Sequence, residues 1–197
     1  MFDEKIKERI DMLDVNLVKQ SDSDFTLREI KKEGEAELKV EIKNPGILFE
    51  KLEGKKLGYF NNQKCADFLL YENCGNRWRI HIFEMKRSIA ENEWKKIKAQ
   101  FAGALQNAQA IAGFLGINVD YSDINVYSVF RYDKIHDVSN PAMLRMQNVS
   151  RAEREKNQET ADWDSSTIKL DFPGINSVNH IKVTLDKQNG TGSCVIS

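Results

Sequence analysis

Residues 64–86 read KCADFLLYENCGNRWRIHIFEMK, and this stretch decides the expected fold. Two apolar segments, 64–71 and 78–86, flank residues 72–77, which are rich in turn-forming residues. Apolar segments of this length around such a turn are typical of two buried strands joined as an antiparallel hairpin.

Three charged residues of this hairpin are expected to meet. Side chains alternate between the two faces of a strand, so Glu84 and Lys86 project from the same face. If the register brings Asp67 opposite them, two carboxylates and a lysine converge beside a sheet end. Such a cluster is a known way to hold a divalent metal next to a reacting phosphate.

The pattern of Asp67 followed by Glu84-x-Lys86 resembles the active-site motif of the PD-(D/E)XK nuclease superfamily. The resemblance covers about residues 45–131, and Ala66 stands where the family usually has a proline. It implies an α/β fold with a restriction-endonuclease-like core, in which a mixed central sheet is flanked by helices. It also implies a metal-dependent nuclease, for which DNA is a better-supported substrate than RNA, in restriction, repair or defence against mobile elements.

The length of 197 residues suits a single domain, 1–197. Within it we expect the nuclease-like core at about 45–131, an N-terminal extension at 1–44 and a C-terminal extension at 132–197. Each extension is expected to contribute a β-hairpin.

The longest helical pattern follows the motif, at about 91–115, and Gly116 is expected to end it. Residues 123–130 then read as a strand, which a helical crossover would place parallel to the Glu84 strand. The apolar positions that predict the helix are Ile97, Phe101, Leu105, Ala108, Ala112 and Leu115.

The N-terminal extension predicts a short amphipathic helix at 3–13 and an exposed hairpin formed by 24–31 and 37–43. Asn44-Pro45 is then expected to start a short helix that ends at Gly54. The apolar residues of that helix are Ile47, Leu48 and Leu52.

The C-terminal extension predicts a helix around 145–158 and a terminal hairpin formed by 167–172 and 180–185. Residues 189–193 are rich in glycine and polar residues, so we expect a mobile tail there.

The resemblance implies a Mg²⁺ site, in which Mn²⁺ is a possible substitute. Its ligands would be the carboxylates of Asp67 and Glu84 and the main-chain carbonyl of Met85. The superfamily often adds a glutamate from a helix before the hairpin, and Glu50 or Glu53 is available for that role.

Two further side chains are candidates for catalysis. Lys86 would orient the attacking water and offset charge in the transition state, and we prefer this electrostatic role to that of a general base. Gln100 resembles the glutamine that RecB-like nucleases place beside the metal, and Gln106 and Gln109 are competitors on the same helix. Alternatively, Asp67 caps a turn or forms a structural ion pair with Lys86.

The net charge of −1, from 29 basic and 30 acidic residues, gives no general support for nucleic-acid binding. A local cluster could still contact phosphates without reading sequence. An ordinary solvated helix face explains it equally well. The residues of this cluster are Arg87, Lys95, Lys96 and Lys98.

Other chemistries find little support. His81 alternates with Phe83 on a strand, so a hydrogen-bonded sheet histidine is expected rather than a metal ligand. The three cysteines lack zinc-site spacing and suit a reducing compartment, and no membrane span or secretory start is seen, so we expect a cytoplasmic protein.

The resemblance also leaves open a homodimer or an accessory specificity subunit. Two rival interpretations remain. One is a catalytically inactive nuclease-fold module that binds or regulates. The other is an unrelated α/β interaction protein in which the three charged residues never meet.

Overall fold

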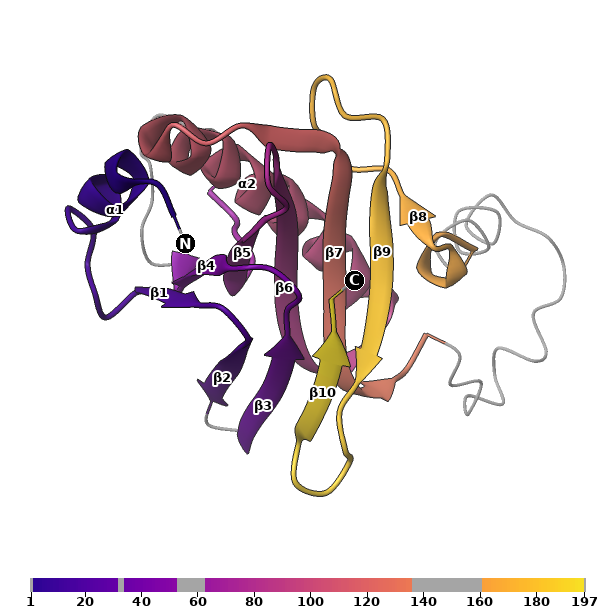
Figure 1. The fold of residues 1–197 in the computed structure, drawn as a ribbon. Coiled ribbons are helices and arrows are strands. Elements are labelled where there is room, and N and C mark those ends of the chain that lie inside the picture. Colours follow the sequence, from indigo (N-terminus) through magenta and orange to yellow (C-terminus); the bar gives the residue numbers. More distant parts are fainter. Residues whose placement is uncertain (1, 32–33, 53–62, 136–160, 197) are drawn as a thin grey trace, which may run out of the picture.

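The computed structural model describes residues 2–31, 34–52, 63–135 and 161–196, which form a mixed α/β fold (Figure 1). In chain order the elements are α1 (Glu4–Ile10), β1 (Val18–Ser21), β2 (Asp24–Lys31), β3 (Gly34–Glu41), β4 (Gly46–Glu50), β5 (Phe68–Asn73), β6 (Trp78–Ile89), α2 (Glu91–Leu115), β7 (Val119–Asp133), β8 (Thr167–Ile168), β9 (Val178–Thr184) and β10 (Thr191–Val195).

The strands form two sheets. The larger sheet has seven strands in the order β1-β4-β5-β6-β7-β9-β8, and the smaller has the order β10-β3-β2. The pairs β6–β7 and β7–β9 are parallel, whereas β1–β4, β4–β5, β5–β6 and β8–β9 are antiparallel. The larger sheet is therefore mixed, as expected.

The sheet is covered on both faces (Figure 1). Helix α2 packs on one face, where Ile97, Phe101 and Leu105 are fully buried against the sheet. The three-stranded sheet packs on the other face, where Leu27 and Leu38 lie in a second core. Burial on both faces explains why β5 and the centre of β6 are nearly continuous runs of apolar residues.

The motif hairpin is confirmed. Strands β5 and β6 are antiparallel, with Phe68 opposite Phe83 and Asn73 opposite Trp78. Helix α2 spans the expected residues and ends at Gly116, whose φ of 67° lies in the left-handed region. Strand β7 then runs parallel to β6, which confirms the expected crossover.

One boundary differs from expectation. The Glu84-Met85-Lys86 triplet was expected to end its strand, but β6 continues to Ile89. The reason is the length of β7, which keeps pairing with β6 as far as Ile89 opposite Asp133.

The prediction of a helix from Asn44-Pro45 onward is wrong. Residues Gly46–Glu50 form strand β4 between β1 and β5. Ile47 packs in the core beneath α2 and Leu48 in the opposite core, so this apolar run is buried on both faces, as a central strand requires. The expected helix end, Gly54, and the candidate Glu53 lie outside the described residues.

The N-terminal extension is more integrated than expected. Helix α1 is capped by Asp3, whose carboxylate accepts the N–H groups of Lys5 and Ile6. Strands β2 and β3 form the expected hairpin. That hairpin is not simply exposed, because one of its faces packs into the second core.

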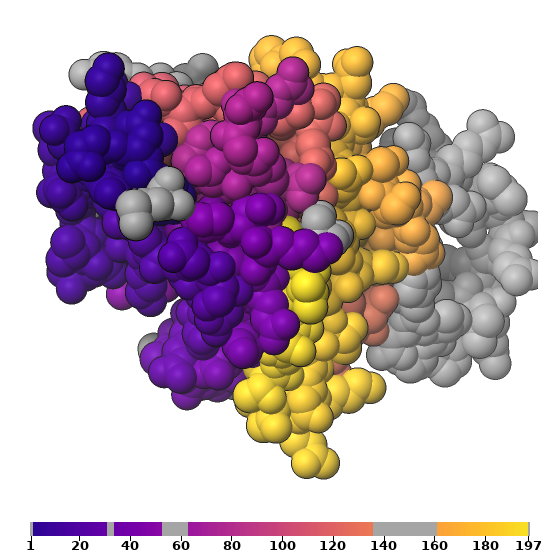
Figure 2. All heavy atoms as spheres, viewed as in Figure 1, coloured from indigo at the N-terminus to yellow at the C-terminus, as the bar shows by residue number. Residues whose placement is uncertain are grey.

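The C-terminal extension departs further from expectation. The segment expected to be a mobile tail leads into β10, which pairs parallel to β3 from Thr191 opposite Glu37 onward. Figure 2 shows this yellow segment against the purple N-terminal strands. The terminal hairpin forms only as two-residue β8 beside β9. The helix expected around 145–158 lies outside the described residues.

No helix in the described part of the chain is long and apolar enough to cross a membrane.

Candidate active site

Asp67 and Glu84 lie side by side where β5 begins. The Asp67 N–H donates to Glu84 Oε2 at 3.2 Å, and Asp67 Oδ2 accepts the N–H of Met85 at 2.8 Å. Strand pairing stops at Phe68 opposite Phe83, so side-chain carboxylates take over from backbone groups just beyond that pair. Both carboxylates are buried, and Glu84 is fully so. The two expected metal ligands therefore lie together.

Lys86 completes the cluster. Its Nζ contacts Glu84 Oε1, and its side chain is 17% exposed. Burial alone lowers the pKa of Lys86, but Glu84, together with Asp67 and Glu29, outweighs burial and raises that pKa above its ordinary value of 10.5. Lys86 is therefore a cation at neutral pH. This charge state agrees with the electrostatic role.

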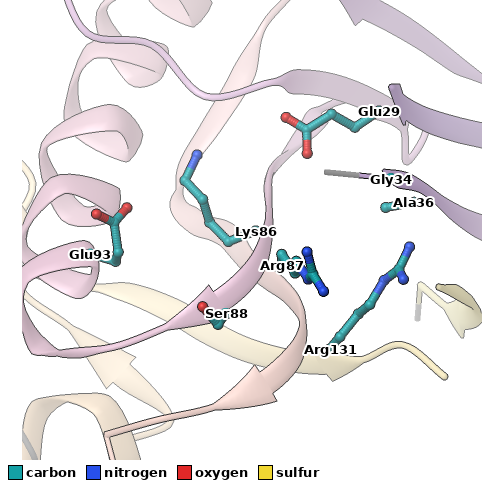
Figure 3. Close-up of a pocket in the computed structure, with 8 residues that line it drawn as sticks. All are labelled: Glu29, Gly34, Ala36, Lys86, Arg87, Ser88, Glu93 and Arg131. Carbon is teal, nitrogen blue, oxygen red and sulfur yellow. The ribbon is translucent and has the colours of Figure 1, made fainter. Parts of the chain in front are cut away.

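The cluster borders a hollow of about 380 Å³, which we call the arginine hollow (Figure 3). Arg87 and Arg131 lie on one side of it, and Lys86 extends between Glu93 of α2 and Glu29 of β2. The Arg131 guanidinium donates to the Glu35 carbonyl. The hollow thus carries three cations and two carboxylates.

A second hollow of about 430 Å³, the central hollow, shares Lys86 and Glu93 with the first. Gln100 lines it, and its Nε2 donates to the Cys65 carbonyl at 3.3 Å, two residues before Asp67. Gln100 thus lies beside the candidate site.

The competing glutamines lie elsewhere. Gln109 is exposed, and Gln106 lines a separate hollow farther along α2. Of the three glutamines considered, only Gln100 shares a hollow with Lys86.

Glu50 does not join this cluster. It lies on β4 and not on a helix, and its Oε1 is 2.6 Å from Lys19 Nζ. Its register partner is Phe68, which pairs in turn with Phe83, so Glu50 points to the face opposite Glu84. The strand that replaced the expected helix accounts for this misplacement.

The four expected phosphate-binding residues separate into different surroundings. Arg87 is exposed in the arginine hollow. Lys96 lines the central hollow and lies 2.6 Å from Glu93. Lys95 and Lys98 line the same hollow as Gln106, and Lys98 Nζ is 2.6 Å from Asp162 Oδ2. They do not form one patch on a single helix face.

Sequence reasoning missed Glu29, Glu93 and Arg131. Glu93 lies in the first turn of α2, where an acidic residue reads simply as a favourable helix-dipole interaction. Glu29 and Arg131 reach the hollow from β2 and β7, and only the packing of the two sheets brings these strands to the motif. Their approach left no local signal in the sequence.

The donor set fits magnesium. Mg²⁺ prefers oxygen ligands and keeps several waters, so one or two carboxylates can be sufficient. Asp67 and Glu84 would supply two, and the Met85 carbonyl lies in the chain between Glu84 and Lys86. Within the described ranges no group of three or more His, Cys, Asp or Glu side chains suits a metal ion.

Comparisons with protein-family models, curated proteins and solved structures find no match to this chain.

Proposed function

We propose that this chain has a restriction-endonuclease-like core and is a magnesium-dependent nuclease that hydrolyses phosphodiester bonds in DNA. The observation that supports the proposal is the hydrogen-bonded cluster of Asp67, Glu84 and Lys86 at the edge of two hollows. The succession of antiparallel hairpin, long helix and parallel strand around it is the arrangement expected of that core.

Each residue has a distinct role in this proposal. Asp67 and Glu84 would hold Mg²⁺, which when bound activates water and neutralises charge on the phosphate. Lys86, a cation at neutral pH, would stabilise the negative charge that develops on the reacting phosphate. Gln100 would orient water or phosphate from the central hollow.

The Glu84–Lys86 ion pair would have to open when metal and substrate bind. Mg²⁺ and the phosphate would each attract one member of this pair. We therefore expect Lys86 to move from Glu84 toward the phosphate when metal and substrate bind. Its side chain is 17% exposed and borders the hollows, so the ammonium group would have to move only a short way to reach a phosphate there.

The test is cleavage of plasmid, linear duplex DNA, single-stranded DNA and RNA with Mg²⁺, Mn²⁺ or EDTA. Wild type is compared with Glu84→Ala and Lys86→Ala. Glu50→Ala is the matched control, because it also removes a largely buried carboxylate paired with a lysine, but on the opposite face. Metal-dependent cleavage that both site variants lose and the control keeps supports the proposal.

A specific observation favours one rival function. Glu84 is already paired with Lys86, and a permanently closed pair would describe an inactive nuclease-fold module that only binds. Calorimetry with Mg²⁺ separates the two. Absence of both cleavage and metal binding in a folded wild-type protein would contradict the nuclease and favour the binding module.

A further inference from the structure

The hollow lined by Gln106 adjoins the central hollow, with which it shares Lys64. It has a volume of about 550 Å³, and we call it the lysine hollow. Four lysines line it, together with Asp171. Lys95 and Lys98 come from α2, Lys64 precedes β5 and Lys169 follows β8.

The three hollows adjoin in a row. The arginine and central hollows share Lys86 and Glu93, and the central and lysine hollows share Lys64. Lys86 therefore lies between Arg87 and Arg131 on one side and the four lysines on the other. We call the row the basic groove.

The charge of this groove contrasts with that of the whole chain. The chain carries a net charge of −1. The lining of the lysine hollow contains four lysines and one carboxylate, and Lys98 Nζ lies 2.6 Å from Asp162 Oδ2. Local segregation of cations in a concave surface attracts a polyanion despite a neutral average.

We propose that the lysine hollow is a second binding site for the DNA backbone, so that the substrate strand crosses the site and is cut internally. This inference rests on the proposed function. Phosphates on one side of the scissile bond would contact Arg87 and Arg131, and those on the other side would contact Lys64, Lys95 and Lys169. A strand held on both sides of Lys86 needs no free end. The protein would therefore act as an endonuclease.

The lining of the groove also sets its specificity. Lysines contact phosphates as point charges and carry no base information. Binding should depend strongly on salt, with the logarithmic slope falling by about 0.7 to 0.9 for every phosphate contact removed. The groove thus predicts cleavage with little sequence preference.

The binding test uses a fluorescent DNA oligonucleotide in EDTA at several salt concentrations, so that cleavage is not required. The double variant Lys64→Glu/Lys169→Glu changes two exposed side chains of the lysine hollow. Lys39→Glu is the control, because this exposed lysine of β3 lies outside the three hollows. We expect the double variant to lose at least about tenfold in affinity and about 1.4 to 1.8 in salt slope, and the control to stay within about twofold.

The cleavage test compares covalently closed circular DNA with the same DNA made linear. We expect wild type to cut both at similar rates. Cutting of linear DNA alone would overturn the inference and leave the proposed nuclease standing. Wild-type affinity and salt slope in a folded double variant would also overturn it. Failure to cut any substrate would overturn the proposed function, whereas the binding test would still decide whether DNA occupies the lysine hollow.

Discussion

The two ends of the β5–β6 hairpin carry charged clusters of different kinds. At the turn end, Glu72 Oε1 accepts from Asn44 at 2.9 Å, while Glu72 Oε2 lies 3.3 Å from His81 and 3.5 Å from Arg79. Partners thus surround both carboxylate oxygens. At the open end, Glu84 Oε2 accepts the Asp67 N–H and Glu84 Oε1 contacts Lys86, but Lys86 borders two hollows.

The difference shows what distinguishes a charged residue with a structural role from one that is expected to act in cleavage. Both glutamates are fully buried, so burial alone does not distinguish them. Glu72 has protein partners that fix it, and the pKa of its carboxyl falls to about 2 because hydrogen bonds from His81 and Asn44 outweigh the effect of burial. The open cluster differs in its cation, because the Lys86 side chain is 17% exposed and borders two hollows. We expect stability to depend mainly on the first cluster and cleavage on the second.

The largest effect on stability is expected from Glu72→Ala. Removal of this carboxylate leaves Arg79 without one partner and His81 without its Nε2 partner in a buried region. His81 is uncharged in the folded chain and Arg79 keeps Asp123, so the loss is that of buried hydrogen-bond partners, which costs about 1–3 kcal/mol in the free energy of unfolding. Urea denaturation measures the loss. Glu50→Ala, whose lysine partner is half exposed, should cost only about 1 kcal/mol, and equal losses in the two variants would contradict the comparison.

The largest effect on cleavage is expected from Glu84→Gln. The amide can still accept the Asp67 N–H but carries no charge for a metal ion or for Lys86. We expect the cleavage rate to fall by about 10²–10³, the range seen when one preorganised electrostatic group is lost. Initial rates on DNA with Mg²⁺ provide the measurement. A folded Glu84→Gln protein that cuts within threefold of wild type would remove this residue from the site.

The response to pH should also distinguish the two ends. Burial lowers the pKa of His81, and it lowers that of His180 to about 4. The unfolded chain protonates these histidines near pH 6.5 but the folded chain does not. The free energy of unfolding should therefore decrease as pH falls from 6.5 toward 4, by up to about 1.4 kcal/mol per pH unit for each histidine. Glu72 adds stability above about pH 4.5 that is lost as pH falls toward 2.

Lys86 should produce the opposite dependence. Its raised pKa means that its contribution is complete below about 10.5 and is lost as pH rises through the higher folded value. Urea denaturation from pH 2 to 12 with wild type, Glu72→Gln and Lys86→Met tests the Glu72 and Lys86 contributions. A loss of stability between pH 4.5 and 2 that Glu72→Gln leaves unchanged, or a loss above pH 10.5 that Lys86→Met leaves unchanged, would contradict the assignment.

The smallest effect is expected from Tyr127→Phe. The Tyr127 hydroxyl lies 3.1 Å from His81 Nδ1, while its ring stacks on Phe83. Phenylalanine keeps the stacking and loses the hydrogen bond, which should cost about 1 kcal/mol in stability. Cleavage should be unchanged, because this face of the hairpin lies opposite Glu84. Thermal unfolding and a cleavage assay on the same preparation check both statements.

The parts of the fold that were predictable have strong local patterns. The apolar spacing of α2 and Gly116 at its end fix a helix without help from other elements. Alternation and hairpin geometry were sufficient to bring Asp67, Glu84 and Lys86 together. His81 was also expected to be a hydrogen-bonded sheet histidine, and it contacts Tyr127 and Glu72.

The rest depended on distant contacts. The short apolar run of β4 follows a helix-start signal, and a short apolar run does not distinguish helix from strand. The segment is a strand because it pairs with β1 on one side and with β5 on the other. Packing around it is tight, since a Cβ on Gly46 would lie 2.9 Å from Leu70. Likewise, the glycines around β10 suggested mobility, but pairing with β3 and hydrogen bonds to the side chains of Asp186 and Asn189 order this segment.

The pairing of β10 with β3 has a consequence for how the protein is made. A ribosome produces β2 and β3 long before β10, and a two-stranded ribbon alone is only marginally stable. Arg131, which contacts the Glu35 carbonyl, also lies so close to Gly190 that a Cβ there would clash with it. Arg131 also lines the arginine hollow, although the β10 segment adds no residue to that lining. The contact of Arg131 with the turn at Gly190 can therefore form only after the last strand has been synthesised, which couples the final segment of the chain to one wall of the hollow.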